Sequence, residues 1–348
     1  MRKQLCKGYK KTLVLLAAAV LMSGCKGQQS PAGTAEAVTA PDGAVTDDTD
    51  SWKPDLKTIT FRVANAAGGN ADLITRLIAK AVQDQYGVTA VVQNITGSSG
   101  FLMATDLNSY DPSPCELMFG TDTLFAIAPL FNESIQVSLD DYEILYGLDN
   151  RQSPSVLAVS SDLGVNTWEE FQEYAKTNRI LAASNTPGGL THLQVAALMG
   201  EAGIEFTSVT DSGGNKNILS CLNGDANCVM VNTGALAPYV DSGQMVPLVQ
   251  YNEDPFEWEY GTIPSVADFG YDIAMESCSV MCVRKDADPV GVAAMAKTIT
   301  DYLGSEKGIA EMKEINTEMV VMDPESAKVC LEKFTETVKR LKEAYYKQ

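Results

Sequence analysis

A strand, a glycine-containing turn, a helix and a second strand follow one another in residues 58–94. Before the turn, Ile59, Phe61 and Val63 alternate with polar residues, which is the period-two pattern of a strand. After it, apolar residues recur at helical spacing, and Gly87 stands where a C′ glycine ends a helix. The segment therefore predicts a βαβ unit. Open α/β sheets bind ligands at the carboxyl ends of such strands.

The turn between the first strand and the helix, residues 66–72, consists mostly of small residues. Its backbone N–H groups, with the helix N-terminus behind them, form a site suited to an anion. We therefore expect ligand contacts from this turn. The residues concerned are Ala67, Gly68, Gly69, Asn70 and Asp72.

The same arrangement returns in the middle of the chain. Residues 179–184 read as a strand, 185–191 as a glycine-rich turn, 192–201 as a helix and 206–209 as the next strand. A third Gly-Gly pair follows at 213–214. One such turn in each half predicts two α/β domains that face each other across a ligand cleft. The residues expected at the cleft from this half are Thr186, Gly188, Gly189, Thr191, His192, Ser212 and Gly213.

Connecting segments divide the chain into discontinuous domains. Strands at 142–148 and 155–160 flank a crossover, an apolar strand returns at 277–284, and helices follow at 289–304 and 324–346. We expect residues 52–150 and 275–348 to form domain 1, and residues 151–274 to form domain 2.

The N-terminus has the pattern of an export signal. Five basic residues precede an apolar run at 12–22, which is too short to span a bilayer comfortably. Met22-Ser23-Gly24-Cys25 resembles a bacterial lipoprotein box, in which the cysteine is lipidated. An ordinary cleaved signal with a coincidental cysteine is the alternative. Residues 1–24 are thus the expected signal peptide, and residues 25–51 a flexible tether that carries the lipid.

Charge and cysteine usage narrow the possible partners. The formal charge is −19, and loss of the signal would make it five units more negative. Such acidity argues against nucleic acid as a partner. Six cysteines follow Cys25, and no CxxC pair or histidine partner makes a metal site. Buried free thiols are the favoured interpretation, although export permits disulfides, for which Cys221/Cys228 and Cys278/Cys282 are near neighbours in sequence.

No set of residues in the chain predicts catalysis. Neither G-x-G-x-x-G nor the Walker A pattern is present, nor a G-x-S-x-G elbow. His192 is the only histidine, and its place at the start of a helix is more typical of capping or packing. We therefore expect no catalytic residues, no metal and no cofactor.

Both turns contain side-chain amides and free N–H groups, the second also contains hydroxyls, and neither contains Lys or Arg. A ligand carboxylate would then be held by neutral donors, which reconciles anion binding with an acidic chain. Asp72 and Asp122 are the carboxylates expected nearest the cleft. If the ligand also carries an ammonium group, one of them should pair with it.

A resemblance to a known family covers nearly all of residues 52–348. Its most specific part is 66–72 with Arg76, followed by 92–94 and Gly97-Ser98-Ser99-Gly100; it continues through 186–193, 219–225 and 263–270. These segments are similar to the Bug family, the extracytoplasmic solute receptors of tripartite tricarboxylate transporters.

The resemblance implies a two-lobed, periplasmic-binding-protein-like α/β receptor that closes on a small carboxylate, held by the two turns partly through ordered water. It also implies that Thr121 and Asp122 lie near the cleft. The expected receptor is a monomer, lipid-anchored in the periplasm or at the outer face of the cell membrane, that delivers its ligand to integral-membrane transporter subunits. Departures at 209–211 and 275–278 leave di- or tricarboxylates, aromatic acids and amino acids open as ligands.

Two other functions remain open. A sensory or scaffold lipoprotein of the same fold would present a ligand-dependent surface to a signalling partner. An enzyme is the third and weakest possibility, because nothing in the sequence favours catalysis.

Overall fold

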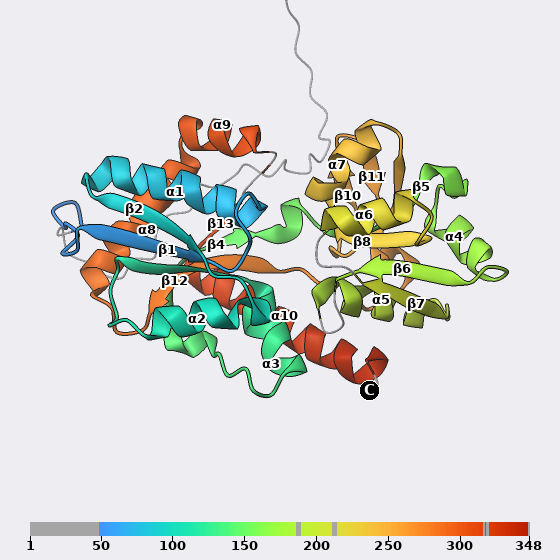
Figure 1. Ribbon diagram of the computed structural model, residues 1–348, viewed down its shortest axis with the longest axis horizontal. Coiled ribbons are helices and arrows are strands. Elements are labelled where there is room, and N and C mark those ends of the chain that lie inside the picture. Colours follow the sequence, from blue (N-terminus) through green and yellow to red (C-terminus); the bar gives the residue numbers. More distant parts are fainter. Residues whose placement is uncertain (1–48, 186–188, 211–213, 316, 318–319, 347–348) are drawn as a thin grey trace, which may run out of the picture. The chain divides into compact units, whose positions relative to one another are not determined.

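The protein is described from a computed structural model, over residues 49–185, 189–210, 214–315, 317 and 320–346. Within these residues the chain forms two mixed β-sheets with helices on both faces, and one small hairpin (Figure 1). The predicted signal, the lipoprotein box with Cys25 and most of the tether lie outside the described residues. No helix among the described residues is long and apolar enough to cross a membrane.

The first sheet has six strands in the order β13-β4-β12-β3-β1-β2. β1 pairs in parallel with β2 and β3, whereas β12 runs antiparallel to β3 and β4. The strands are β1 Thr58–Val63, β2 Thr89–Asn94, β3 Glu116–Gly120, β4 Tyr142–Asp149, β12 Cys278–Arg284 and β13 Val321–Met322. The parallel β1–β2 pair confirms the βαβ unit predicted from residues 58–94.

The second sheet has five strands in the order β7-β6-β8-β5-β9. β6 pairs in parallel with β7 and β8, and β5 runs antiparallel to β8 and β9. The strands are β5 Ser155–Ser160, β6 Ile180–Ser184, β7 Phe206–Thr210, β8 Cys228–Asn232 and β9 Met245–Gln250; the hairpin is β10 Phe256–Trp258 with β11 Gly261–Ile263. The second predicted βαβ unit is therefore also present.

Helices cover both faces of each sheet because the strands bury side chains on both faces. In the first sheet α1 and α8 pack on one face, with α2 and part of α10 on the other. In the second sheet α6 and α7 lie opposite α4 and α5 (Figure 1). The helices are α1 Asn70–Tyr86, α2 Phe101–Asn108, α3 Ala128–Phe131, α4 Trp168–Ala175, α5 Leu190–Glu201, α6 Gly214–Leu222, α7 Thr233–Asp241, α8 Pro289–Gly304, α9 Glu306–Glu314 and α10 Pro324–Tyr345.

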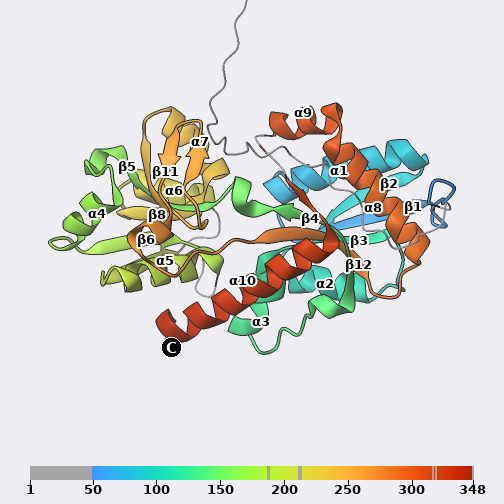
Figure 2. The same cartoon turned by 180° about the vertical axis from the view of Figure 1, so that it is seen from behind.

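Two elements contribute side chains to the cores of both sheets. In α10, Ala327 and Leu331 lie in a core of the first sheet, whereas Phe334, Val338 and Leu341 lie in a core of the second (Figure 2). A π-helical turn at Thr123–Ile127 also contributes side chains to a core of each sheet. The second half of α10 thus packs with the second sheet, although its sequence was grouped with domain 1. The boundaries at 150/151 and 274/275 stay a prediction.

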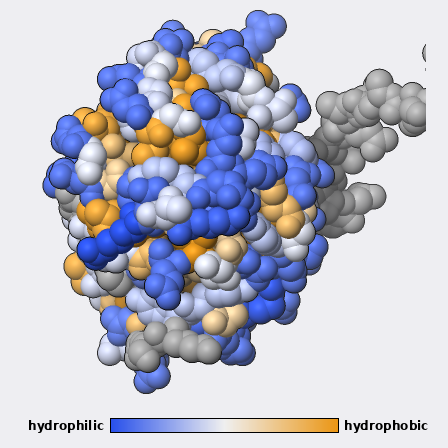
Figure 3. Space-filling model, turned by 90° about the vertical axis from the view of Figure 1, so that its right-hand side faces the viewer, coloured by the Kyte–Doolittle hydropathy of each residue, from blue (hydrophilic) through white to orange (hydrophobic). Residues whose placement is uncertain are grey.

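The surface is mainly hydrophilic, with apolar residues in separate small patches on the face that Figure 3 shows. The six described cysteines are free thiols, and all except Cys330 are buried. Buried thiols were the interpretation favoured from the sequence.

Candidate ligand-binding site

The predicted turns lie at the carboxyl ends of parallel strands. β1, β2 and β3 run in one direction in the first sheet, so the segments that follow them begin at one edge. β6, β7 and β8 have the same relation in the second sheet. Each sheet therefore brings together, at one edge, turns that lie far apart in the sequence.

The first turn is held in shape by Asp72, whose side chain is buried (1% exposed). Its carboxylate accepts hydrogen bonds from the N–H of Gly68 at 2.8 Å, from Asn94 Nδ2 at 2.8 Å and from Arg76 Nε at 2.9 Å. Arg76 Nη2 also lies 2.8 Å from the other carboxylate oxygen. Gly68 has φ +82, a left-handed conformation that favours glycine. Asp72 thus supports the turn from inside the protein.

Burial alone would raise the pKa of Asp72. The hydrogen bonds from Arg76, Gly68 and Asn94, together with the positive charge of Arg76, outweigh burial and lower the pKa below its ordinary value. Asp72 is therefore an ionised carboxylate with its charge matched by Arg76. Ala67 and Gly68 are exposed residues of this turn, and the N–H of Gly68 already donates to Asp72. Asn70 is exposed too, and accepts a hydrogen bond from Thr317 Oγ1 at 2.8 Å.

The helices behind the two turns begin in the same unusual way. Gly69 is the N-cap of α1 (φ −75, ψ 162) and Gly189 is the N-cap of α5 (φ −86, ψ 162), and neither helix has a side-chain cap from the described residues. In contrast, α4, α7, α8, α9 and α10 each begin with a side chain that accepts a hydrogen bond from a first-turn N–H. Uncapped first-turn N–H groups are available to an anion.

The second turn is only partly described. Thr191 Oγ1 accepts a hydrogen bond from the N–H of Asn185 at 3.0 Å, which closes the turn across its ends. Asn217, buried in α6, donates to Asn185 Oδ1 at 3.3 Å, and its own side-chain oxygen has no hydrogen-bond partner among the described residues. Sequence reasoning missed Asn217, because a polar residue within a helix reads as an exposed position. The predicted residues Thr186, Gly188, Ser212 and Gly213 lie outside the described residues.

His192 lies on the face of α5 next to β7 and the end of α10. Its Nε2 is 3.0 Å from Ser208 Oγ, and its ring packs edge-on against Tyr346. These residues line a surface groove of about 910 Å³. Burial lowers the pKa of His192, so the neutral ring is favoured. The structure therefore gives the His192 side chain a hydrogen bond to Ser208 and a ring contact with Tyr346, and its contact with a ligand stays a prediction.

Thr121 and Asp122 follow β3, where Gly120 leaves room for the ring of Phe125. Asp122 is buried and accepts hydrogen bonds from the N–H of Thr123 at 2.5 Å and from Ser277 Oγ at 2.6 Å. Burial raises the pKa of Asp122 despite these bonds. Asp122 thus caps the π-helical turn and connects it to the segment before β12.

The turn after β2 has an uncommon backbone. Ser98 and Ser99 have φ +47 and +55, between Gly97 and Gly100, which also have positive φ. Gly100 is the N-cap of α2, again without a side-chain cap. Sequence reasoning used these residues only as part of a family resemblance, and nothing in residue type predicts left-handed serines. Such positions concentrate at functional sites.

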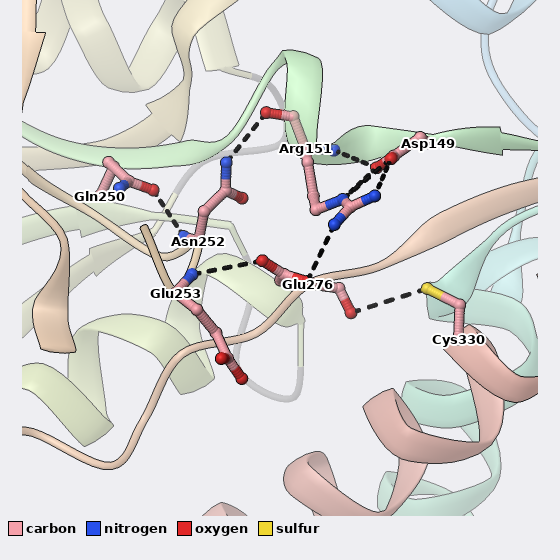
Figure 4. Close-up of polar contacts among 7 residues, drawn as sticks. All are labelled: Asp149, Arg151, Gln250, Asn252, Glu253, Glu276 and Cys330. Atoms are coloured by element: carbon pink, nitrogen blue, oxygen red, sulfur yellow. Dashed lines mark hydrogen bonds and ion pairs between the residues drawn. The ribbon is translucent and has the colours of Figure 1, made fainter. Parts of the chain in front are cut away.

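An ion-pair network occupies the two crossovers between the sheets (Figure 4). Arg151 lies after β4 and binds the buried Asp149 through Nε and Nη2, at 2.8 and 2.6 Å from one carboxylate oxygen. It also lies 3.6 Å from Glu276 on the return crossover. Asn252 donates to the backbone oxygen of Arg151, and the N–H of Glu253 donates to Glu276. The sequence indicated only a connection here.

No group of three or more His, Cys, Asp or Glu in the described part of the chain is placed to hold a metal ion. The chemistry of the turns is that of hydrogen-bond donors and buried, matched charges. Donors of this kind suit a small anion, and the described residues of the turns include no nucleophile beside a base.

Comparison with known proteins decides the family. Residues 74–343 match the TctC family model, described as tripartite tricarboxylate transporter family receptor. The chain belongs to this receptor family. Among relatives of the receptor, a Cupriavidus necator protein described as UPF0065 protein in gbd 5'region is 25% identical over 234 residues, 66% of this chain and 70% of that protein. BugT of Bordetella pertussis is 22% identical over 269 residues, 75% of this chain and 81% of BugT.

Solved structures share the fold of the receptor. The periplasmic binding protein BugD has a TM-score of 0.70 at 19% identity, over 83% of this chain and 97% of BugD. An R. palustris protein solved with adipate has a TM-score of 0.71 at 21% identity, with 83% and 97% covered. MatC from Rhodopseudomonas palustris, with bound malate, has a TM-score of 0.66 at 17% identity, with 83% and 98% covered.

These findings confirm the resemblance to the Bug family and the predicted two-lobed, periplasmic-binding-protein-like α/β fold. The family is one of solute-binding receptors, so the expectation that the chain is not an enzyme is confirmed at the level of the family. The residues that contact the ligand stay a prediction.

Proposed function

We propose that this receptor captures a small organic carboxylate between the turn at residues 66–69 and the turn at residues 185–191, and delivers it to the membrane subunits of a tripartite transporter. Family membership supports the transport role. The dicarboxylates in two proteins of the same fold, adipate and malate, support the ligand class.

The observation that carries this proposal is the matched pair of glycine N-caps. Gly69 and Gly189 have nearly the same φ and ψ, and they begin one helix in each sheet without a side-chain cap. A carboxylate at either helix would accept hydrogen bonds from first-turn N–H groups and gain from the helix dipole. Each charge-assisted hydrogen bond of this kind contributes about 1.5–3 kcal/mol.

The charges near the turns fit a mechanism with neutral donors. Arg76 is matched by Asp72, and Arg151 is matched by Asp149 with Glu276 nearby. These guanidinium groups are half-exposed but already paired, so they hold protein carboxylates rather than a ligand. Backbone N–H groups and neutral side chains such as Thr191 then supply the donors for the ligand.

The proposal includes lipid attachment at Cys25 and a flexible tether that ends before Trp52. Two or more acyl chains would keep the receptor at the membrane that holds its transporter. The domain boundaries predicted at 150/151 and 274/275 belong to the same proposal, because they place one turn in each domain.

A thermal-shift screen of the full mature chain against a panel of small carboxylates tests the ligand class. A ligand at a concentration of about 100 times Kd should add about 2.7 kcal/mol to the free energy of unfolding, which raises Tm by a few degrees. Matched amides of each acid serve as controls, because they keep the shape and remove the charge. Equal shifts with acid and amide would contradict carboxylate recognition.

Uptake into vesicles separates transport from sensing. Vesicles that contain the membrane subunits of the transporter should accumulate the identified acid only when the receptor is added. Binding without receptor-dependent uptake would instead favour a sensory or scaffold role for the same fold.

A further inference from the structure

Two of the free cysteines pack against each other's elements. Cys278 is the first residue of β12 and is fully buried, whereas Cys330 lies in α10 and is partly exposed. The Cys278 thiol donates to the carbonyl oxygen of Ala327, with Sγ at 3.4 Å. The Cys330 thiol reaches the carbonyl oxygen of Glu276 at 4.0 Å (Figure 4).

These contacts are reciprocal, because each thiol meets the backbone that carries the other. Ala327 precedes Cys330 by three residues, so both lie on one face of α10. Glu276 precedes Cys278 by two residues in the segment that enters β12. The interaction between the two thiols raises the pKa of Cys278 and lowers the pKa of Cys330, which leaves Cys330 the better nucleophile.

The other nearby cysteines are not arranged in this way. Cys278 and Cys282 are four residues apart on one strand, about 13 Å, which is too far for a disulfide. The Cys282 thiol instead donates to the backbone oxygen of Met118 at 3.6 Å. Cys221 and Cys228 belong to cores on opposite faces of the second sheet. The pairs suggested by sequence proximity are therefore replaced by a pair that only the fold brings together.

We propose that Cys278 and Cys330 are a redox pair, which forms a reversible internal disulfide by exchange with a disulfide oxidant. The oxidant is a small-molecule disulfide or the disulfide of an oxidoreductase, both of which an extracytoplasmic receptor can meet.

The exchange proceeds in two balanced steps. The Cys330 thiolate attacks one sulfur of the oxidant, whose S–S bond breaks, and one half leaves as a thiolate while the other stays on Cys330 as a mixed disulfide. Cys278 then loses its proton to the departed thiolate, and its sulfur attacks Cys330 Sγ. The second half of the oxidant leaves as a thiolate and takes a proton from water. The cysteine pair is oxidised by two electrons, and one oxidant disulfide is reduced to two thiols.

The position of the bond gives it a consequence for the receptor. Glu276, beside Cys278, belongs to the crossover and lies near Arg151 of the other crossover. Cys330 belongs to the helix that packs in the cores of both sheets. A disulfide would therefore link the end of the return crossover covalently to α10. The crossover would be restrained in this way only in the oxidised protein.

Peptide mapping of the full-length protein tests the pair directly. The reduced protein is incubated with oxidised glutathione at about pH 8, quenched with N-ethylmaleimide and digested without reductant. We expect one linked peptide pair that contains Cys278 and Cys330, and dithiothreitol should separate it. The proposal would be overturned if, in the oxidised wild-type protein, both cysteines still reacted with maleimide after unfolding. It would also be overturned if other cysteines were linked instead.

Single variants separate the two steps. In the Cys278→Ser variant, Cys330 should keep one glutathionyl group, because the resolving sulfur is absent. In the Cys330→Ser variant, Cys278 should carry no glutathionyl group. Cys282→Ser is the matched control on the same strand, and should form the internal disulfide within about twofold of the wild-type rate. A stable glutathione adduct on wild-type Cys330, without linked peptides, would also overturn the proposal. Peptide mapping of the wild-type protein tests the proposed disulfide even if a serine variant fails to fold.

Discussion

Asp72 and Asp122 are two buried carboxylates of the candidate site whose environments act on their charge in opposite directions. Asp72 has a matched arginine and several donors, so its folded state favours the ionised form. Asp122 has hydroxyl and N–H donors but no ion pair among the described residues, so burial favours its protonated form. Replacing each by asparagine should therefore affect stability in opposite ways.

Asp72→Asn should lower the free energy of unfolding by about 1–3 kcal/mol near pH 7, because Arg76 is left without its partner. The folded pKa of Asp72 is lowered, so its contribution is complete above the ordinary pKa of an aspartate and is lost as the pH falls through the folded pKa. Urea unfolding curves at neutral and acid pH measure this difference, which should narrow in acid. If the stability difference between wild type and variant were the same at all pH values, the lost stability would come from packing and not from the charge of Asp72.

Asp122→Asn should leave the receptor as stable as wild type or more stable near pH 7. Because the folded pKa of Asp122 is raised, wild-type stability falls as the pH rises from the ordinary aspartate pKa through the folded value. The asparagine amide can donate to Ser277 and its oxygen can accept from Thr123, so the contacts survive. The same urea curves check this result. A loss above about 1 kcal/mol at neutral pH would mean that the fold needs the carboxylate itself.

At the scale of an element, the turn before α1 offers a matched pair of variants at Gly69. Its φ is ordinary, but a Cβ would lie 3.2 Å from the backbone oxygen of Ala66. Gly69→Ala should therefore bind ligand within about threefold of wild type, whereas Gly69→Val, with branched methyl groups in front of the helix N-terminus, should lose at least tenfold, about 1.4 kcal/mol. Titration calorimetry with the identified acid measures both. Wild-type affinity in the valine variant, with unchanged circular dichroism, would make the turn a connector only.

The elements show which parts of the fold the sequence could predict. The alternation of Ile59, Phe61 and Val63 with polar residues predicted β1, although its polar residues are buried as well. The helical spacing after Gly69 predicted α1, because this helix buries one face. The helix at Pro289–Gly304 was predicted to the residue, since an Asp-Pro start and a glycine end mark it. The two-residue strand β13 was not, because pairing with β4, and no local pattern, defines it.

The site shows the same limit. Glycine turns are visible in a sequence because residue type restricts the backbone. Arg76 and Arg151 were not recognised as partners of Asp72 and Asp149, because an ion pair depends on side-chain direction. The division of α10 between two cores is also invisible, since its apolar stripe looks the same whichever core it meets.

For the whole molecule, affinity should depend little on salt. The candidate site has its arginines paired, and the net charge of −19 repels an anion rather than attracts it. Fixed dipoles at short range are screened little, whereas charges on the surface are screened over about 8–10 Å at physiological ionic strength. Kd should change by less than about threefold, about 0.65 kcal/mol, between low and moderate salt. A steep loss of affinity with salt would instead indicate an unpaired Lys or Arg at the ligand.

Membrane attachment also belongs to the whole molecule. Cys25→Ala removes the thiol that lipidation requires, so the receptor should move from the membrane fraction to the soluble or secreted fraction. Immunoblots of fractionated cells check this result, with Cys115→Ala as a control that keeps the lipoprotein box. Unchanged membrane association of the Cys25 variant would contradict the anchor.

Two crossovers alone would let the sheets rotate about one axis, but α10 adds a rigid rod beside that axis. A rod packed in both cores permits rotation only if it slides along one of them. The contact suited to sliding is between α10 and α5, where Gly200 leaves a smooth surface under the ring of Tyr345; a Cβ there would lie 2.4 Å from the ring. We therefore expect opening to combine sliding of α10 over α5 with hinge rotation at the crossovers. Gly200 lies outside both turns, so a side chain there would change how easily the receptor opens and releases its ligand without touching the groups expected to recognise it.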